Sequence, residues 1–186
     1  MKKNIINATI FIVLMLIVTG CTTKGKVYTS NLNSVNELQD KELKKVRVDY
    51  NTGAAVVYEI SLGRGTNKMS SPYTTFQEYL ERALTEHLVL SNLYNENSSL
   101  SIKTTLLDNQ LDTGLSDGVA LLSANFKILE NDQEKLNKTF QISHKWESSF
   151  MAAIAIPRTV DNYVIAMQKL IDSFLSDDEV LKVLKK

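Results

Sequence analysis

Three consecutive stretches between residues 100 and 147 alternate apolar and polar side chains, and they limit the fold more than any other feature. The stretches run from Leu100 to about Leu111, from Val119 to Glu130 and from Leu136 to Glu147. Alternation with a period of two is typical of strands that bury one face. Turn-forming residues, Gly114 to Gly118 and Asn131-Asp132, separate them. The sequence therefore predicts an antiparallel meander with helices covering one side.

Two long helices are predicted to supply that cover. The first begins at a capping box, Thr75 to Glu78. In this motif the Thr75 side chain can accept a hydrogen bond from the Glu78 N–H, and the Glu78 side chain can accept one from the Thr75 N–H. The second follows Pro157 and keeps apolar residues at helical spacing from Val160 to Leu175. A further capping box, Ser176 to Glu179, predicts a short terminal helix.

Two more strands, Val46 to Tyr50 and Ala55 to Ile60, are predicted to be joined by a turn at Asn51-Thr52-Gly53. Together these elements predict a two-layer α+β domain. It has an antiparallel sheet of about five strands with two main helices on one face. We expect a single domain over residues 45–186, a length sufficient for one core.

The N-terminus has the layout of a bacterial lipoprotein signal. Lys2 and Lys3 precede an uninterrupted apolar core of nine residues, Ile10 to Val18. This core is well short of the roughly 20 residues that cross a bilayer. The segment Val18-Thr19-Gly20-Cys21 then resembles a lipobox, which predicts cleavage between Gly20 and Cys21 and acylation of Cys21. Cys21 is the only cysteine in the chain, so no disulfide competes for it. A plain secretory signal or an uncleaved anchor is the alternative.

Residues 21–44 are predicted to form a flexible, lipidated tether, because this stretch is polar and its apolar residues are scattered. Without residues 1–20, which hold Lys2 and Lys3, the 21 basic residues fall to 19 against 21 acidic ones. A net charge of about minus two argues against nucleic-acid binding and against a polybasic attraction to anionic lipids.

The sequence offers little for catalysis. The two histidines, His87 and His144, both lie on predicted apolar faces and are interpreted as packed residues. With the sole cysteine assigned to lipid and no second histidine at ligand spacing, neither a metal site nor another cofactor is expected. Ser148 and Ser149 lack the flanking glycines of a nucleophile turn. The segment Gly63 to Lys68 lacks the full spacing of a phosphate-binding loop.

Seven apolar residues in a row, Phe150 to Ile156, stand where a polar connection is usual. Two alternatives are open. Phe150, Met151, Ile154 and Ile156 can be buried, which the frequency of methionine and alanine in cores favours, or they can form an exposed patch for a protein or lipid partner.

With its lipobox and its order of strands and helices, the chain resembles the small α+β envelope lipoproteins of the YajG type. It is more loosely similar to auxiliary lipoproteins of ABC-type lipid transporters. The resemblance implies a non-enzymatic accessory protein that faces the periplasm. Thr22, in place of aspartate after the cysteine, is similar to the residue found in lipoproteins sorted to the outer membrane. In an organism without an outer membrane, the expected site is the outer face of the cell membrane.

We therefore expect a lipid-anchored binding or accessory module in envelope maintenance or transport. Its partners would be the membrane, through the lipid on Cys21, and a protein or a lipid-like ligand. A pilot or structural lipoprotein of a secretion or transport assembly is the alternative. An envelope hydrolase, which needs His87 or His144 beside a nucleophile in a polar cleft, is a third hypothesis.

Overall fold

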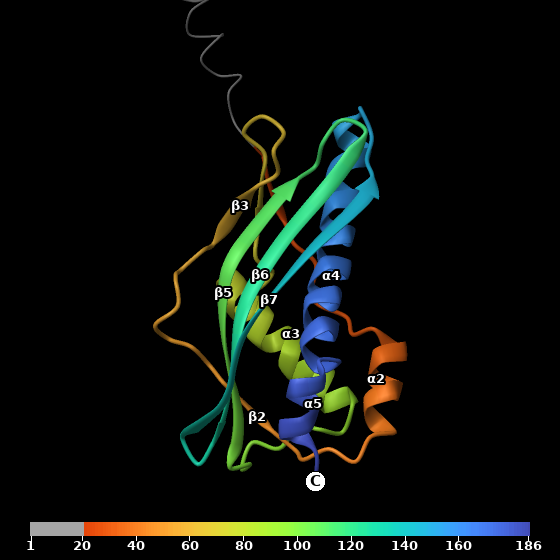
Figure 1. Ribbon diagram of the computed structural model, residues 1–186. Helices are drawn as coiled ribbons and strands as arrows, with labels where there is room; N and C mark the ends of the chain where they lie inside the picture. The colour runs from red at the N-terminus through yellow and green to blue at the C-terminus, as the bar shows by residue number, and fades with distance from the viewer. Residues whose placement is uncertain (1–20) are drawn as a thin grey trace, which may run out of the picture.

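The computed structural model describes residues 21–186, and this part of the chain forms two sheets and four helices (Figure 1). The predicted α+β fold is confirmed. The predicted signal peptide, residues 1–20, lies outside the described residues. In chain order the elements are β1 (Thr22–Lys24), α2 (Leu32–Gln39), β2 (Arg47–Asp49), β3 (Glu59–Ser61), β4 (Lys68–Ser70), α3 (Phe76–Leu90), β5 (Leu100–Asp112), β6 (Asp117–Glu130), β7 (Gln133–Glu147), α4 (Ala152–Leu175) and α5 (Asp178–Leu184).

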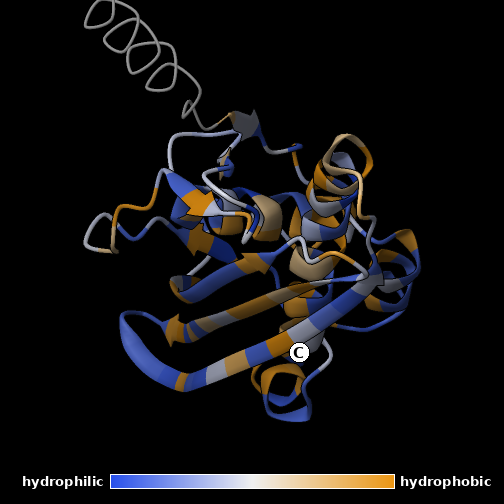
Figure 2. Ribbon diagram, turned by 90° about the horizontal axis from the view of Figure 1, so that it is seen from above, coloured by the Kyte–Doolittle hydropathy of each residue, from blue (hydrophilic) through white to orange (hydrophobic). Residues whose placement is uncertain are grey.

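The larger sheet has the strand order β2-β5-β6-β7 and contains the predicted meander. β5, β6 and β7 pair antiparallel, whereas the short β2 pairs parallel to β5. The period-two pattern appears in Figure 2 as orange and blue bands along the long strands. The inward residues of β6 have no exposed surface: Ala120, Leu122, Ala124, Phe126 and Ile128.

Helices α3 and α4 cover the same face of this sheet. α4 packs across β6 and β7, and α3 packs across β2 and β5. At the centre of the α4 contact, the rings of Phe126 and Phe174 are stacked with centroids 4.2 Å apart, and Phe140 meets both rings edge-on. Aromatic pairs of this geometry stabilise a core beyond their buried area. The predicted one-sided cover is therefore present.

Two helix boundaries differ from the prediction. α4 begins at Ala152, five residues before Pro157, which lies inside the helix. A proline there removes one hydrogen bond, to the carbonyl of Ala153, and Ala153 is exposed so that water can replace that bond. α5 is capped by Asp177, not Ser176, because the Asp177 carboxylate accepts hydrogen bonds from the N–H groups of Glu179 and Val180.

The hairpin predicted over residues 46–60 is wrong. β2 belongs to the larger sheet, while β3 pairs antiparallel with β4 in a second sheet of order β1-β4-β3. The reason lies just after β2, where the Asn51 side chain donates hydrogen bonds to the Thr104 carbonyl and the Thr105 hydroxyl. These bonds hold the chain beside β5 and prevent a tight return.

The flexible tether predicted for residues 21–44 is also corrected, because this segment is packed onto the fold. β1 pairs parallel with β4, and α2 follows after Asn31, whose side chain caps it. Tyr28 is 2% exposed, and Val35 and Leu38, one helical turn apart, are each 4% exposed. The apolar residues that looked scattered therefore include a short buried stripe anchored by a buried tyrosine.

A buried polar network joins α3 to the edge of β5 where β2 has ended. The Gln77 side chain accepts a hydrogen bond from the Leu106 N–H at 2.7 Å and donates to the Thr104 carbonyl at 3.1 Å. Gln77 also donates to the Glu81 carboxylate, which accepts from the Asn51 N–H at 2.7 Å. Glu81 is only 3% exposed, although glutamate is rarely buried without partners. The network satisfies the strand edge beside a β-bulge between Leu106 and Asp108.

We predict that Gln77→Ala lowers the free energy of unfolding by about 1–3 kcal/mol, because it leaves the Leu106 N–H and the Glu81 carboxylate short of partners. Urea denaturation measures the change. The matched control is Gln133→Ala at an exposed position, which should change stability by less than about 0.5 kcal/mol. Equal losses in the two variants would contradict the role given to the network.

Candidate functional site

Cys21 is the first residue that the structure describes, and it lies at one end of the molecule (Figure 1). Its thiol is free and the residue is exposed. The Cys21 carbonyl accepts a hydrogen bond from the Lys68 N–H at 3.2 Å, and β1 begins at the next residue. The β3–β4 loop, the β5–β6 turn and the junction between β7 and α4 lie at this same end (Figure 1). We call it the anchor end.

Arg64, in the β3–β4 loop, ties these segments together. Its guanidinium group donates hydrogen bonds to the carbonyls of Gly114, Ser149 and Phe150; the Ser149 and Phe150 bonds measure 2.9 and 3.1 Å. In addition, the Ser148 N–H donates to the Ser116 carbonyl at 2.7 Å. Of the two residues beside Leu115, Gly114 is therefore bonded to Arg64, and Ser116 is bonded to the segment that carries Phe150.

An apolar patch lies on the segments that Arg64 joins. Phe150 is 80% exposed, Leu115 63%, Met151 60% and Ile154 41%; these four residues are the apolar patch from here on. The favoured prediction of burial is therefore wrong for Phe150, Met151 and Ile154. It holds for Ile156, which is half-buried against the core. Leu115 was missed, although a leucine inside a predicted turn was a usable signal.

The first turn of α4 lacks the side-chain cap that α2, α3 and α5 possess. Met151 occupies the N-cap position in an extended conformation and makes no side-chain hydrogen bond to the helix. Asn31, Thr75 and Asp177 fill the same position in the other three helices and accept hydrogen bonds there. Methionine at this position gives up stability that a small polar residue would supply.

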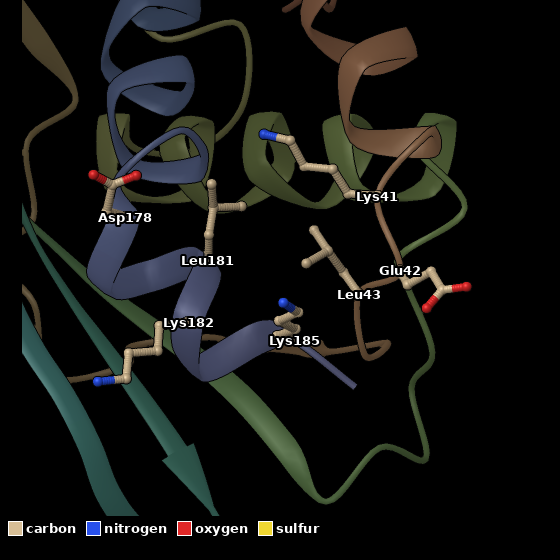
Figure 3. Close-up of a pocket in the computed structure, with 7 residues that line it drawn as sticks. All are labelled: Lys41, Glu42, Leu43, Asp178, Leu181, Lys182 and Lys185. Carbon is tan, nitrogen blue, oxygen red and sulfur yellow. The ribbon is translucent and has the colours of Figure 1, made fainter.

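A groove of about 540 Å³ lies at the opposite end, where the chain terminates. Figure 3 shows Leu43 and Leu181 facing each other across it, from the segment after α2 and from α5. The rim carries three lysines and two carboxylates: Lys41, Lys182, Lys185, Glu42 and Asp178. The groove therefore has an apolar floor and a mildly basic rim.

His87 is fully buried and serves packing, as predicted. The Tyr28 hydroxyl lies 3.2 Å from Nδ1, and the Ser34 hydroxyl lies 3.3 Å from Nε2. His87 has no exposed surface, so a substrate cannot reach its ring in this structure. Burial lowers the pKa of His87, and the Asp172 carboxylate opposes this shift. His87 thus fastens the N-terminal segment to α3.

His144 is also mostly buried, on the face of β7 that meets α4. Lys169 lies 2.9 Å from Nδ1, and Asn162 Oδ1 lies 2.9 Å from Nε2. Since the lysine can only donate, the imidazole is neutral and donates from Nε2 to Asn162. Burial lowers the pKa of His144, an effect that Lys169 strengthens and Asn162 opposes. Neither ring nitrogen contacts a hydroxyl nucleophile.

The remaining sequence candidates have structural partners. The Ser148 hydroxyl donates to the Thr113 carbonyl at 2.5 Å, and the Ser149 hydroxyl accepts from the Met151 N–H. Residues 63–68 form the turn that carries Arg64 between β3 and β4. Over residues 21–186, no three histidine, cysteine, aspartate or glutamate side chains converge as metal ligands.

None of the helices within the described part of the chain combines the length and apolar character needed to span a bilayer.

No family model matches this sequence, and no curated protein matches it. Solved structures do. Protein XCC0632 from Xanthomonas campestris, described under the family model DUF330, aligns with a TM-score of 0.56 at 15% identity, over 83% of this chain and 95% of that one. A lipoprotein candidate from Caulobacter crescentus has a TM-score of 0.43 at 12% identity over 75% and 88%. A minor lipoprotein from Acinetobacter baumannii has 0.45 at 14% over 78% and 97%.

The Xanthomonas protein shares the fold of this chain across nearly all of its own length. At 15% identity that likeness concerns the fold alone. The resemblance to YajG-type lipoproteins stays a prediction.

The uncapped start of α4 gives a test. We predict that Met151→Asp raises the free energy of unfolding by about 0.5–1 kcal/mol, because the new carboxylate accepts a hydrogen bond from a free N–H of the first turn. Denaturant unfolding measures the gain. Phe150→Asp, one residue before the cap, is the control and should shift stability by less than about 0.5 kcal/mol. Unfolding of the domain by Phe150→Asp would show that the patch is part of the core.

A second test concerns His87. Its folded pKa lies below the unfolded value of 6.5, so the unfolded chain takes up the proton first as the pH falls. The stabilisation from neutral His87 is complete above that value and is lost as the pH falls through the folded pKa. We predict that His87→Gln reduces the loss of stability between about pH 7.5 and about pH 5.5.

Urea titrations at a series of pH values measure how steeply the free energy of unfolding changes with pH. His144→Gln is the comparison variant, because His144 is less deeply enclosed and its pKa is lowered by the same cause. Glu86, beside His87, has a raised pKa caused by burial and works in the opposite direction. An unchanged slope in His87→Gln would contradict a neutral, buried imidazole.

Proposed function

We propose that this chain is a non-enzymatic lipoprotein. Its Cys21 is acylated, it is held at the periplasmic side of the outer membrane, and its domain binds a partner in envelope maintenance or transport. The observation that carries the proposal is the position of Cys21. The only cysteine of the chain ends a lipobox-like segment, and it is exposed and free at the point where the fold begins. An acyltransferase can therefore reach the thiol without unfolding the domain.

The non-enzymatic part of the proposal is supported by the surroundings of the two histidines. A histidine that acts as a general base must lie within hydrogen-bond reach of a reacting group and be open to substrate. His87 lies among Tyr28 and Ser34 without room for a substrate, and His144 is held by Lys169 and Asn162. Both rings are engaged in internal hydrogen bonds, which counts against either histidine as the base of a hydrolase.

The groove between Leu43 and Leu181 is our candidate for the partner or ligand site. It lies at the end of the molecule away from Cys21, so in an anchored protein it points away from the membrane (Figures 1 and 3). An apolar floor with a lysine-rich rim suits an apolar group that carries negative charge. A protein segment with acidic and apolar residues and an anionic lipid-like ligand both have this chemistry.

The anchor is tested by comparing the native protein with Cys21→Ser in cells. We predict that the native protein partitions with membranes and gains the mass of a diacylglyceryl group and an acyl chain, whereas Cys21→Ser is released. The reason is that each buried methylene contributes about 0.8 kcal/mol, so that several chains hold a protein firmly. Membrane fractionation and intact mass measure the two outcomes. Complete membrane retention of cleaved Cys21→Ser would exclude the lipid anchor.

Pulldown from solubilised membranes with the same pair of proteins tests the binding role. Partners kept by Cys21→Ser bind the domain itself, and partners lost with the anchor depend on location. Mild crosslinking distinguishes the alternative, because a stoichiometric large assembly is expected of a pilot lipoprotein and not of a monomeric binding module.

A further inference from the structure

We infer that the apolar patch, Leu115, Phe150, Met151 and Ile154, is a membrane-contact surface that enters the headgroup region of the same bilayer that holds Cys21. The inference rests on the proposed acylation of Cys21 and goes beyond it. In this arrangement the domain touches the membrane through its own side chains, and only at the end that carries Cys21.

The patch and Cys21 lie at the same end of the molecule. A short path of contacts links them: Lys68 donates from its backbone N–H to the Cys21 carbonyl, and Asn67, beside Lys68, donates to the carbonyl of Arg64. Arg64 in turn donates to the carbonyls of Ser149 and Phe150. All of these segments lie at the anchor end in Figure 1.

No flexible linker separates Cys21 from the first strand. β1 starts at Thr22 and pairs with β4 from its first residue, where Thr22 is opposite Lys68. One residue spans at most about 3.6 Å, so the acyl chains on Cys21 begin within about that distance of an ordered strand. A flexible linker would let the domain stand away from the membrane, but this geometry brings the anchor end against it.

The chemistry of the patch also favours an apolar partner. Phe150 and Leu115 are exposed on tight connections that usually carry polar residues. Met151 occupies a helix cap where a polar residue would be more stabilising. Apolar side chains kept exposed at a cost in stability are typical of a contact surface. In an anchored protein, the apolar medium next to this end is the bilayer.

The test uses full-length lipidated protein, in which acylation blocks the Cys21 thiol. An engineered cysteine is then the only site for an environment-sensitive fluorophore. Phe150→Cys places the label on the patch. Val89→Cys is the matched control, because Val89 is 53% exposed on the last turn of α3, and residues that follow it line a cavity with Lys186 at the far end. The probe is a vesicle of phosphatidylethanolamine and phosphatidylglycerol that contains a nitroxide-labelled lipid.

We expect blue-shifted emission and several-fold stronger quenching by the nitroxide lipid at position 150 than at position 89. Adding Met151→Asp should reduce the quenching at position 150 several-fold without lowering the free energy of unfolding. Equal, weak quenching at both positions in protein that floats with the vesicles would overturn the membrane contact and leave the anchor proposal standing. If the native protein carries no acyl chains and does not float with the vesicles, both the lipid anchor and the membrane contact are excluded.

The Cys21→Ser form of the Phe150→Cys protein tests whether a second copy of the chain, instead of the membrane, covers the patch. Its label should report a water-like environment when no vesicles are present. A blue shift that grows with protein concentration would assign the patch to a second copy of the chain and would overturn the membrane surface.

Discussion

The packing of α4 onto the meander is the constraint on which the rest of the fold depends. The apolar face of the meander has to be buried against another element. α4 runs along β6 and β7 and stacks Phe174 on Phe126 at the centre of the sheet. Once this layer is closed, α3 is held beside β5, and the N-terminal segment has a surface on which to pack. The length of the sheet therefore separates the end that carries Cys21 from the end that carries the groove.

Two polar contacts complete what apolar packing begins. The network of Gln77 and Glu81 satisfies the edge of β5 where β2 stops, and His87 receives Tyr28 from the N-terminal segment. Both involve buried polar groups, which favour one arrangement because any shift leaves a donor or acceptor without a partner. The contact between His87 and Tyr28 holds the polar N-terminal segment on the fold.

The sequence predicted the elements that carry a strong period and missed those that depend on contacts distant in the chain. The meander, α3 and α5 follow from alternation, helical spacing and caps, all of which are local. The pairing of β3 with β4 depends on Asn51 and β5, more than fifty residues apart. The order of residues 22–44 depends on Tyr28 reaching His87. The apolar run at Phe150 was recognised, but its exposure was not, because an apolar run reads alike whether it is buried or exposed. Leu115 joins this run only in the folded chain, through the hydrogen bonds of Arg64 and of Ser148 with Ser116.

The direct start of β1 after Cys21 has a mechanical consequence. In an acylated chain, any force that draws the domain from the membrane enters at Cys21 and passes along the axis of β1. The bonds between β1 and β4 are then loaded together in shear instead of being opened one after another. Tyr28, further along the same segment, resists the same pull from inside the core. The three-residue strand therefore bears the load first, and its rupture would release only the chain before Tyr28, Thr22 to Val27, which extends to about 20 Å.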